Sequence, residues 1–177
     1  MLTGVRPSGN LTIGNYLGAI KNFVDKQDEQ KENIMFLADL HAITSPIPKA
    51  NLEQAIYDCV AMYLACGVDP KKTKIFKQVD VMEHSVLGFI MTFQTRMGEL
   101  SRMTQYKLKS QGSGKGGIDT GLFIYPSLMV ADILAYNTRY KNSMFIVYDM
   151  GIIRDVEQFT NPFSEHDNIF IVVVKHW

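Results

Sequence analysis

Residues 7–15 read Pro-Ser-Gly-Asn-Leu-Thr-Ile-Gly-Asn and lie between a short strand-like segment at residues 1–4 and a helix-like segment that starts near Gly14. Beyond Gly14 the apolar residues recur at intervals of three and four, which is the period of a helix. The first turn of a helix leaves backbone N–H groups unpaired and carries about half a positive charge, so it attracts phosphate. The stretch therefore predicts a strand–turn–helix unit with a candidate phosphate-binding turn.

Four residues of this turn allow two uses. Gly9 and Gly14 would let the backbone approach a ligand closely, because no Cβ intervenes. Thr12 and Asn15 would add neutral donors to a phosphate whose charge grows during a reaction. The alternative is an ordinary Pro-Gly turn in which Thr12 and Asn15 only cap the helix. The residues alone leave both uses open.

Strand-like and helix-like segments alternate along the chain. The expected strands are residues 1–4, 33–40 and 74–79, and the expected helices run from residue 14 onward and over residues 52–64, 85–93 and 120–136. Gly67 is placed to end the second helix and Pro70 prevents its continuation, whereas Pro126 either interrupts or begins the last one. Such alternation predicts βαβ units and an α/β fold with a parallel sheet.

Composition sets the class of protein. A chain of 177 residues, 46% hydrophobic and 20% charged, suits one domain, or one domain and a fragment, and is unlike a disordered tail. A formal net charge of +0 excludes nucleic-acid binding through bulk positive charge. Cys59 and Cys66 match no zinc spacing and indicate a reducing compartment, and we assign no metal ligands. No apolar run reaches the roughly 18 residues of a membrane span, so we expect a soluble cytoplasmic protein.

Two later segments lack helical or strand periodicity. Residues 110–117, Ser-Gln-Gly-Ser-Gly-Lys-Gly-Gly, predict a surface loop. A P-loop would need Gly in place of Lys109 and a hydroxyl residue in place of Gly116, and it has neither. Residues 139–177 show no clear amphipathic helix before residue 154, and they close on Ile-Phe-Ile-Val-Val-Val, a buried strand or an exposed aggregation-prone one.

Four blocks carry a resemblance to a known family. They are GVRPSGNLTIGNYLGA (4–19), FLADLHAIT (36–44), GELSRMTQYKLKS (98–110) and GLFIYPSLMVADILAYNT (121–138). In this order they resemble the class I aminoacyl-tRNA synthetases, and most closely the bacterial-type tryptophanyl-tRNA synthetase family, with TIGN (12–15) where the HIGH tetrapeptide is found. The resemblance implies a Rossmann-like catalytic domain of which residues 1–138 form the N-terminal part, followed by a divergent tail at residues 139–177.

The resemblance also implies an ATP site at the first block. The residues that match the family's ATP contacts are Arg6, Pro7, Ser8, Gly14 and Asn15, and those that match its catalytic signature are Thr12 and Asn15. The family often has Gln where Arg6 stands. ATP would be a substrate, with Mg²⁺ on its phosphates.

The implied tryptophan site consists of Asp132, Met129, Tyr125 and His41. Asp132 matches the acid that accepts a hydrogen bond from the indole N–H, and such a buried acceptor penalises rings that lack the donor. Without the family pattern, Asp132 could be a solvated carboxylate on a helix face, although its neighbours Ala131 and Ile133 are apolar. His41 could equally be a structural histidine, and Met129 and Tyr125 plain core residues.

Residues 96–115 carry a local net charge of +4. The five cations are Arg96, Arg102, Lys107, Lys109 and Lys115, against one acid, Glu99. This stretch is a candidate surface for the tRNA acceptor end. It also resembles the family's dimer-forming region, and a solvated helix face is the third interpretation.

The reaction implied is that of a tryptophan–tRNA ligase: the tryptophan carboxylate attacks the α-phosphorus of ATP, and the adenylate then acylates tRNA. The family's KMSKS loop and helical anticodon-reading domain are not found in these 177 residues. We therefore expect a truncated form, close to inactive alone, whose tail comes from a frameshift or an unrelated join. The alternatives are a non-catalytic fragment that still forms homodimers, a tyrosyl-tRNA synthetase relative, and a generic nucleotide-binding domain.

Overall fold

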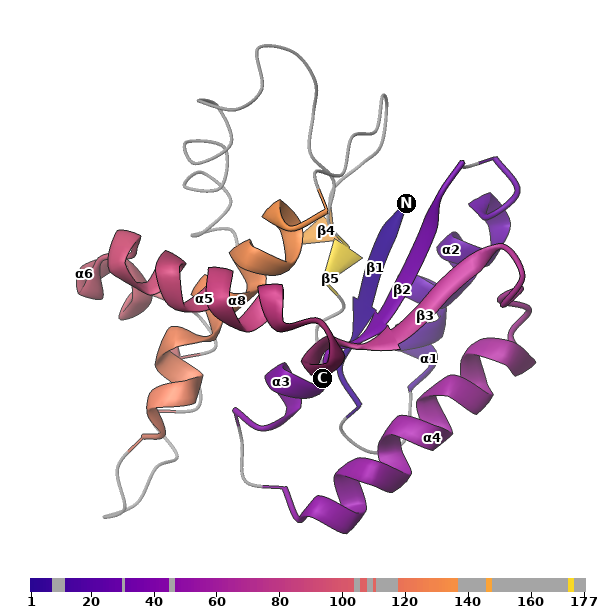
Figure 1. Ribbon diagram of the computed structural model, residues 1–177. Helices are drawn as coiled ribbons and strands as arrows, with labels where there is room; N and C mark the ends of the chain where they lie inside the picture. The colour runs from indigo at the N-terminus through magenta and orange to yellow at the C-terminus, as the bar shows by residue number, and fades with distance from the viewer. Residues whose placement is uncertain are drawn as a thin grey trace.

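The chain forms a parallel sheet covered by helices on both faces (Figure 1). The computed structural model describes residues 1–7, 12–29, 31–44, 47–103, 106–107, 110 and 118–136, together with the short strands at 146–147 and 172–173. Residues 111–117 of the predicted loop and most of the predicted tail at 139–177 lie outside these residues.

The sheet has the strand order β3-β2-β1-β5-β4, and each neighbouring pair is parallel. Its strands are β1 (Leu2–Val5), β2 (Asn33–Leu37), β3 (Thr73–Lys77), β4 (Ile146–Val147) and β5 (Val172–Val173). Val5 pairs with Leu37 and Leu37 with Lys77, so the first three strands end level at their carboxyl edge. The predicted α/β class is confirmed, and the C-terminal apolar run contributes β5 beside β1.

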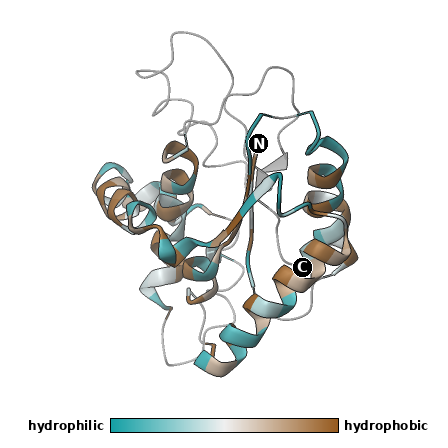
Figure 2. Ribbon diagram, turned by 45° about the vertical axis from the view of Figure 1, so that its right-hand side comes forward, coloured by the Kyte–Doolittle hydropathy of each residue, from teal (hydrophilic) through white to brown (hydrophobic). Residues whose placement is uncertain are grey.

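The helices are ordered along the chain as follows: α1 (Ile13–Asn15), the π-helical turn η1 (Tyr16–Ile20), α2 (Lys21–Lys26), α3 (Asp39–Ala42), α4 (Lys49–Ala65), the 3-10 turn η2 (Gln78–Asp80), α5 (Met82–Gln94), α6 (Met97–Leu100) and α8 (Thr120–Leu134). Figure 2 shows α2 and α4 on one side of the sheet and α5 and α8 on the other. None of the helices in the described residues combines the length and the hydropathy of a membrane span.

The alternation of side chains along β2 divides the core between these two layers. Met35 and Leu37 pack with the α2 residue Phe23 and the α4 residue Tyr63, all of them buried. Phe36, between them in sequence, points to the opposite face, where it packs with Leu2 and near Tyr136. This period of two is what a strand buried on both faces requires.

Two helix ends show how local sequence sets the boundaries. Gly67 has φ 101°, and Val68 N–H donates to the Tyr63 carbonyl at 3.0 Å while Gly67 N–H donates to that of Leu64 at 3.1 Å. This is a Schellman motif, as the position of Gly67 predicted. By contrast, the strand expected to reach residue 40 ends at Leu37, because the Asp39 carboxylate binds backbone N–H groups and starts α3.

The last helix passes through Pro126 without ending, and it packs closely on α5. A Cβ on Gly88 of α5 would lie 3.0 Å from Leu128 Cδ1 and 3.3 Å from the Leu128 Cα. The absence of a side chain at Gly88 therefore lets the two helices approach each other. This contact matters for the site below, because both helices carry residues of that site.

Candidate functional site

The carboxyl edge of the sheet gathers polar residues from three connections. Arg6 follows β1, Asp39 and His41 lie in α3 after β2, and Gln78 and His84 lie in η2 and α5 after β3. Because β1, β2 and β3 end level, these connections begin side by side. Ligands of open parallel sheets bind at this edge.

Asp132 of α8 reaches the same edge and forms the centre of this polar cluster. Its Oδ2 lies 2.8 Å from His41 Nε2, and its Oδ1 accepts from Gln78 Nε2 at 2.6 Å and lies 2.6 Å from His84 Nδ1. The residue is 5% exposed. The interpretation of Asp132 as a solvated carboxylate is therefore wrong.

The charge of Asp132 is stabilised by these contacts. Burial alone raises the pKa of a carboxyl group, but the hydrogen bonds from His41 and His84 and their electrostatic interaction outweigh it, so the pKa of Asp132 is lowered. The carboxylate is ionised at neutral pH and acts only as an acceptor. It can therefore receive one more N–H or O–H donor.

The predicted tryptophan-site residues share one side of this cluster. Tyr125, Met129 and Asp132 are four and three residues apart and so lie on one face of α8. The ring of Tyr125 meets that of His41 edge-on, with centroids 6.2 Å apart. Met129 is buried. The structure thus brings His41, Tyr125 and Asp132 together, with Met129 on the same helix face.

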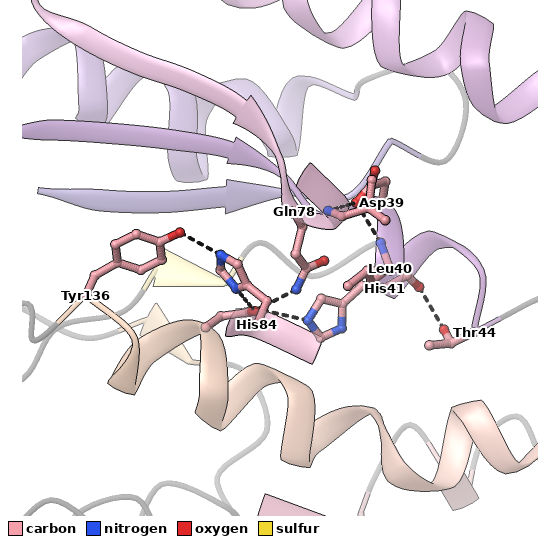
Figure 3. Close-up of polar contacts among 9 residues, drawn as sticks. Asp39, Leu40, His41, Thr44, Gln78, His84 and Tyr136 are labelled. Atoms are coloured by element: carbon pink, nitrogen blue, oxygen red, sulfur yellow. Dashed lines mark hydrogen bonds and ion pairs between the residues drawn. The ribbon is translucent and has the colours of Figure 1, made fainter. Parts of the chain in front are cut away.

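Asp39 holds two of the connections together. Its Oδ1 accepts from the backbone N–H of Leu40 at 2.9 Å and from that of Val79 at 3.0 Å, so it ties α3 to η2 (Figure 3). Burial raises the pKa of Asp39 more than the hydrogen bonds from Val79 and Leu40 lower it. Asp39 therefore positions the segments that carry His41 and Gln78.

The predicted ATP-site residues lie after β1. Arg6 Nη2 donates to the Ala42 carbonyl at 3.1 Å, and burial lowers the pKa of the guanidinium. Pro7 is buried and Gly14 is exposed, while Ser8 lies outside the described residues.

Thr12 and Asn15 form a capping box. The Asn15 backbone N–H donates to Thr12 Oγ1 at 3.4 Å, and Asn15 Oδ1 accepts from the Thr12 backbone N–H and hydroxyl at 2.8 Å each. The capping role is therefore present. Phosphate binding by these residues stays a prediction.

Sequence reasoning missed Gln78, His84 and Tyr136. Gln78 and His84 are fully buried, and His84 Nε2 lies 2.6 Å from the Tyr136 hydroxyl. The predicted strand at 74–79 included Gln78, whereas β3 ends at Lys77 and Gln78 begins the turn at the sheet edge where ligands bind. His84 lies within a helix and carries no comparable signal.

Comparison with known proteins shows the family. Residues 1–147 match the model of class I tRNA synthetases (W and Y), and the chain belongs to this family. A tryptophan–tRNA ligase of Mycoplasmopsis pulmonis is 50% identical over 141 residues, which cover 77% of this chain and 42% of that protein.

Two solved structures share the architecture. The tryptophanyl-tRNA synthetase of Mycoplasma pneumoniae matches with a TM-score of 0.80 and 36% identity over 97% of this chain and 50% of that one. The Campylobacter jejuni enzyme complexed with ADP and tryptophan matches with a TM-score of 0.76 and 39% identity over 91% and 50%. The chain thus spans about half the length of these relatives.

Proposed function

We propose that this chain is the ATP- and tryptophan-binding part of a tryptophan–tRNA ligase. The observation that carries the proposal is the buried, ionised Asp132, whose Oδ2 has His41 as its partner among the described residues. The relatives cited above are tryptophan enzymes, and one of them is a complex with ADP and tryptophan. The indole N–H of tryptophan would donate to the remaining acceptor position of Asp132 Oδ2.

The chemistry of this acceptor favours tryptophan over tyrosine. The family model covers both the W and the Y enzymes, so the choice depends on the site. An indole N–H only donates, whereas a buried phenol oxygen both donates and needs a donor in return. The donors of His41, Gln78 and His84 at this point are already bound to Asp132. The site thus offers an ionised acceptor, which suits a ring that only donates.

The first reaction would take place between Asp132 and the turn after β1. The tryptophan carboxylate would attack the α-phosphorus of ATP, and pyrophosphate would leave as the adenylate forms. Arg6, Pro7, Ser8, Gly14 and Asn15 are proposed to bind the nucleotide. Thr12 and Asn15 would supply neutral donors to the phosphate as its charge grows.

Mg²⁺ belongs to this proposal only as the ion that accompanies the nucleotide. Mg²⁺ is commonly held by substrate phosphates and water, with one or two carboxylates. Among the described residues, no three His, Cys, Asp or Glu side chains gather in a way that could hold a metal. We therefore assign no protein ligand to it and derive no step through it.

Thermal unfolding of the full 177-residue chain tests the proposed ligand. Tryptophan at 100 times its Kd should add about 2.7 kcal/mol to the free energy of unfolding and thereby raise the unfolding temperature. Tyrosine at the same concentration should not. Stabilisation by tyrosine alone would instead favour the tyrosine enzyme. Stabilisation by neither amino acid would contradict the proposal.

Tryptophan-dependent exchange between ATP and pyrophosphate tests whether the chain is active alone. These 177 residues contain no KMSKS sequence. The loss of one transition-state contact typically lowers kcat by a factor of about a hundred or more. We therefore expect binding without measurable exchange. Exchange by the isolated chain would overturn the interpretation as a non-catalytic fragment.

The proposed partner on the surface of α5 is a second copy of this chain. Large apolar side chains are exposed at intervals of three and four along this helix and into α6: Met82, Val86, Phe89, Phe93 and Met97. The rings of Phe89 and Phe93 meet edge-on, 4.9 Å apart. A stripe of this kind on a soluble helix marks an interface, and the family resemblance favours a homodimer.

Sedimentation velocity with two glutamate variants tests the homodimer. Phe89 is 65% exposed on α5, and Tyr57, on α4 across the sheet, is 72% exposed and serves as the matched control. Phe89→Glu should give monomers, while the native chain and Tyr57→Glu should sediment as dimers. A native chain that stays monomeric at high concentration would refute the dimer.

Three further parts of the proposal concern tRNA, location and the tail. The described cations Arg96, Arg102 and Lys107 are exposed, and they are proposed to face tRNA, whereas Lys109 and Lys115 lie outside the described residues. Free Cys59 and Cys66 suit a cytoplasmic location. The division at residue 138 stays a proposal, since the family match continues to residue 147, and the nucleotide sequence after the codon for Thr138 tests it.

A further inference from the structure

The two carboxylate oxygens of Asp132 have different surroundings. Oδ1 receives Gln78 Nε2 and His84 Nδ1, both at 2.6 Å, and these two donors use both acceptor positions of that oxygen. Oδ2 has His41 Nε2 at 2.8 Å. One oxygen is therefore anchored by buried side chains, and the other keeps an acceptor position for a ligand.

His84 is itself held on every side. Its ring is fully buried, with centroids 5.4 Å from that of Phe36, 6.3 Å from that of Phe76 and 5.3 Å from that of Tyr136. Its second nitrogen, Nε2, lies 2.6 Å from the Tyr136 hydroxyl (Figure 3). The imidazole is thus fixed both by packing and at each nitrogen.

The direction of the hydrogen bonds follows from the charge of Asp132. An ionised carboxylate only accepts, so His84 Nδ1 must carry a hydrogen. The other ring nitrogen, Nε2, pairs with the Tyr136 hydroxyl at 2.6 Å. Burial, more than the charges of Asp132 and Glu83, raises the pKa of Tyr136 to about 12, so this hydroxyl keeps its proton at neutral pH. The hydrogen-bonded chain therefore links Tyr136 through His84 to Asp132.

We propose that His84, oriented by Tyr136, is a positioning residue that anchors Oδ1 of Asp132 and thereby directs Oδ2 at the ring N–H of the bound amino acid. This inference rests on the proposed function. Without His84, Gln78 would be the remaining described donor to Oδ1, and the carboxyl group could turn about its terminal torsion, which is a soft one. Discrimination for a ring N–H would then weaken even though no ligand contact had been removed.

Three variants separate positioning from packing. His84→Leu removes the donor to Asp132 and fills the buried position with an apolar side chain. His84→Asn keeps an N–H near the place of Nδ1, so it should rescue the function. Tyr136→Phe removes only the hydroxyl and retains the ring against Phe76, whose centroid lies 6.2 Å away. Circular dichroism and thermal unfolding without ligand show whether each variant is folded.

Calorimetric titration of the full chain uses two ligands of the same shape: tryptophan, and the alanine derivative in which sulfur replaces the indole N–H. The native chain should prefer tryptophan. His84→Leu should lower the affinity for tryptophan by about 10- to 100-fold, as expected for a hydrogen bond to a charged group. It should change the affinity for the sulfur analogue by less than about twofold. His84→Asn should retain most of the preference, and Tyr136→Phe should lose part of it. A folded His84→Leu variant with an unchanged preference would overturn the proposal.

Nitrogen-15 NMR of labelled histidine gives a test that needs no ligand and no buried substitution at His84. The native spectrum should show a proton on Nδ1 of His84, and Tyr136→Phe should shift the Nε2 resonance. An Nδ1 without a proton would overturn the proposal. A native chain that binds no tryptophan would refute the proposed function instead, and the NMR result would still decide how His84 contacts Asp132.

Discussion

Asp132 receives donors from three elements, and its distance along the chain from each of them explains what sequence reasoning could find. Its partners His41, Gln78 and His84 are 91, 54 and 48 residues away. The apolar neighbours of Asp132 indicated a buried carboxylate, and the resemblance indicated His41. Gln78 and His84 were missed because only the level ends of the parallel strands bring them to this point.

The stability of the chain should depend on pH through Asp132. Its lowered pKa means that the ionised group stabilises the fold above its unfolded pKa of about 3.9, and that this stabilisation is lost as the pH falls through the folded value. Asp132→Asn should lower the free energy of unfolding by about 3 kcal/mol at pH 7. The new amide N–H would face the side chains that donate to Asp132 and could not accept from them. Urea unfolding from about pH 7 to about pH 2 should show the difference between the two proteins shrinking once the pH falls below about 3.9.

The raised pKa of Asp39 has the opposite effect on how stability depends on pH. This effect cancels in the difference between the native chain and Asp132→Asn, because both proteins retain Asp39. Asp119→Asn, at an exposed carboxylate that makes no capping bond, is the matched control and should change stability by less than about 0.5 kcal/mol. A cost of Asp132→Asn that does not change with pH would mean that the native carboxyl group is not ionised.

At the scale of elements, periodicity predicted the first three strands and the long helices, and tertiary contacts set what it could not. Gly67 ended α4 as its position required. The strand expected at 33–40 is shorter because Asp39 binds the N–H of Val79, 40 residues away. The helix α8 continues through Pro126, where local sequence could not decide between a break and a start.

The close approach of α5 and α8 at Gly88 should be sensitive to a single methyl group. A Cβ there would meet the Leu128 backbone at 3.3 Å, so Gly88→Ala should separate the helices that carry His84 and Asp132. We expect a loss of about 1–3 kcal/mol in unfolding free energy, and weaker tryptophan binding. Urea unfolding and calorimetry measure the two effects.

Gly18→Ala is the control for this substitution. A Cβ on Gly18 meets nothing within 4 Å, and the residue is helical, so alanine should be neutral or slightly stabilising. If Gly88→Ala were as stable as Gly18→Ala, the close helix contact would not be required.

The capping box after the turn gives a second prediction at this scale. Thr12→Ala removes the acceptor for the Asn15 N–H and should cost about 1 kcal/mol in unfolding free energy. Thr12→Ser keeps the hydroxyl and should stay within about 0.5 kcal/mol of the native chain. Equal stability of all three proteins in urea would show that the Thr12 cap does not stabilise this helix.

On the scale of the whole molecule, the sheet separates two helical layers with different tasks. The α2–α4 layer packs an apolar core on one face and the α5–α8 layer holds the polar cluster at the carboxyl edge of the other (Figure 1). The order of strands and helices was predictable from the sequence, and so was the family.

Calorimetric titration of the native chain and of Asp132→Asn with tryptophan and tyrosine tests the central claim, that Asp132 receives the indole N–H, most directly. We predict that the native chain and Asp119→Asn bind tryptophan but not tyrosine, and that Asp132→Asn loses at least about tenfold in tryptophan affinity, the effect of one hydrogen bond to a charged group. Tryptophan binding by Asp132→Asn with native affinity, or a preference of the native chain for tyrosine, would contradict it.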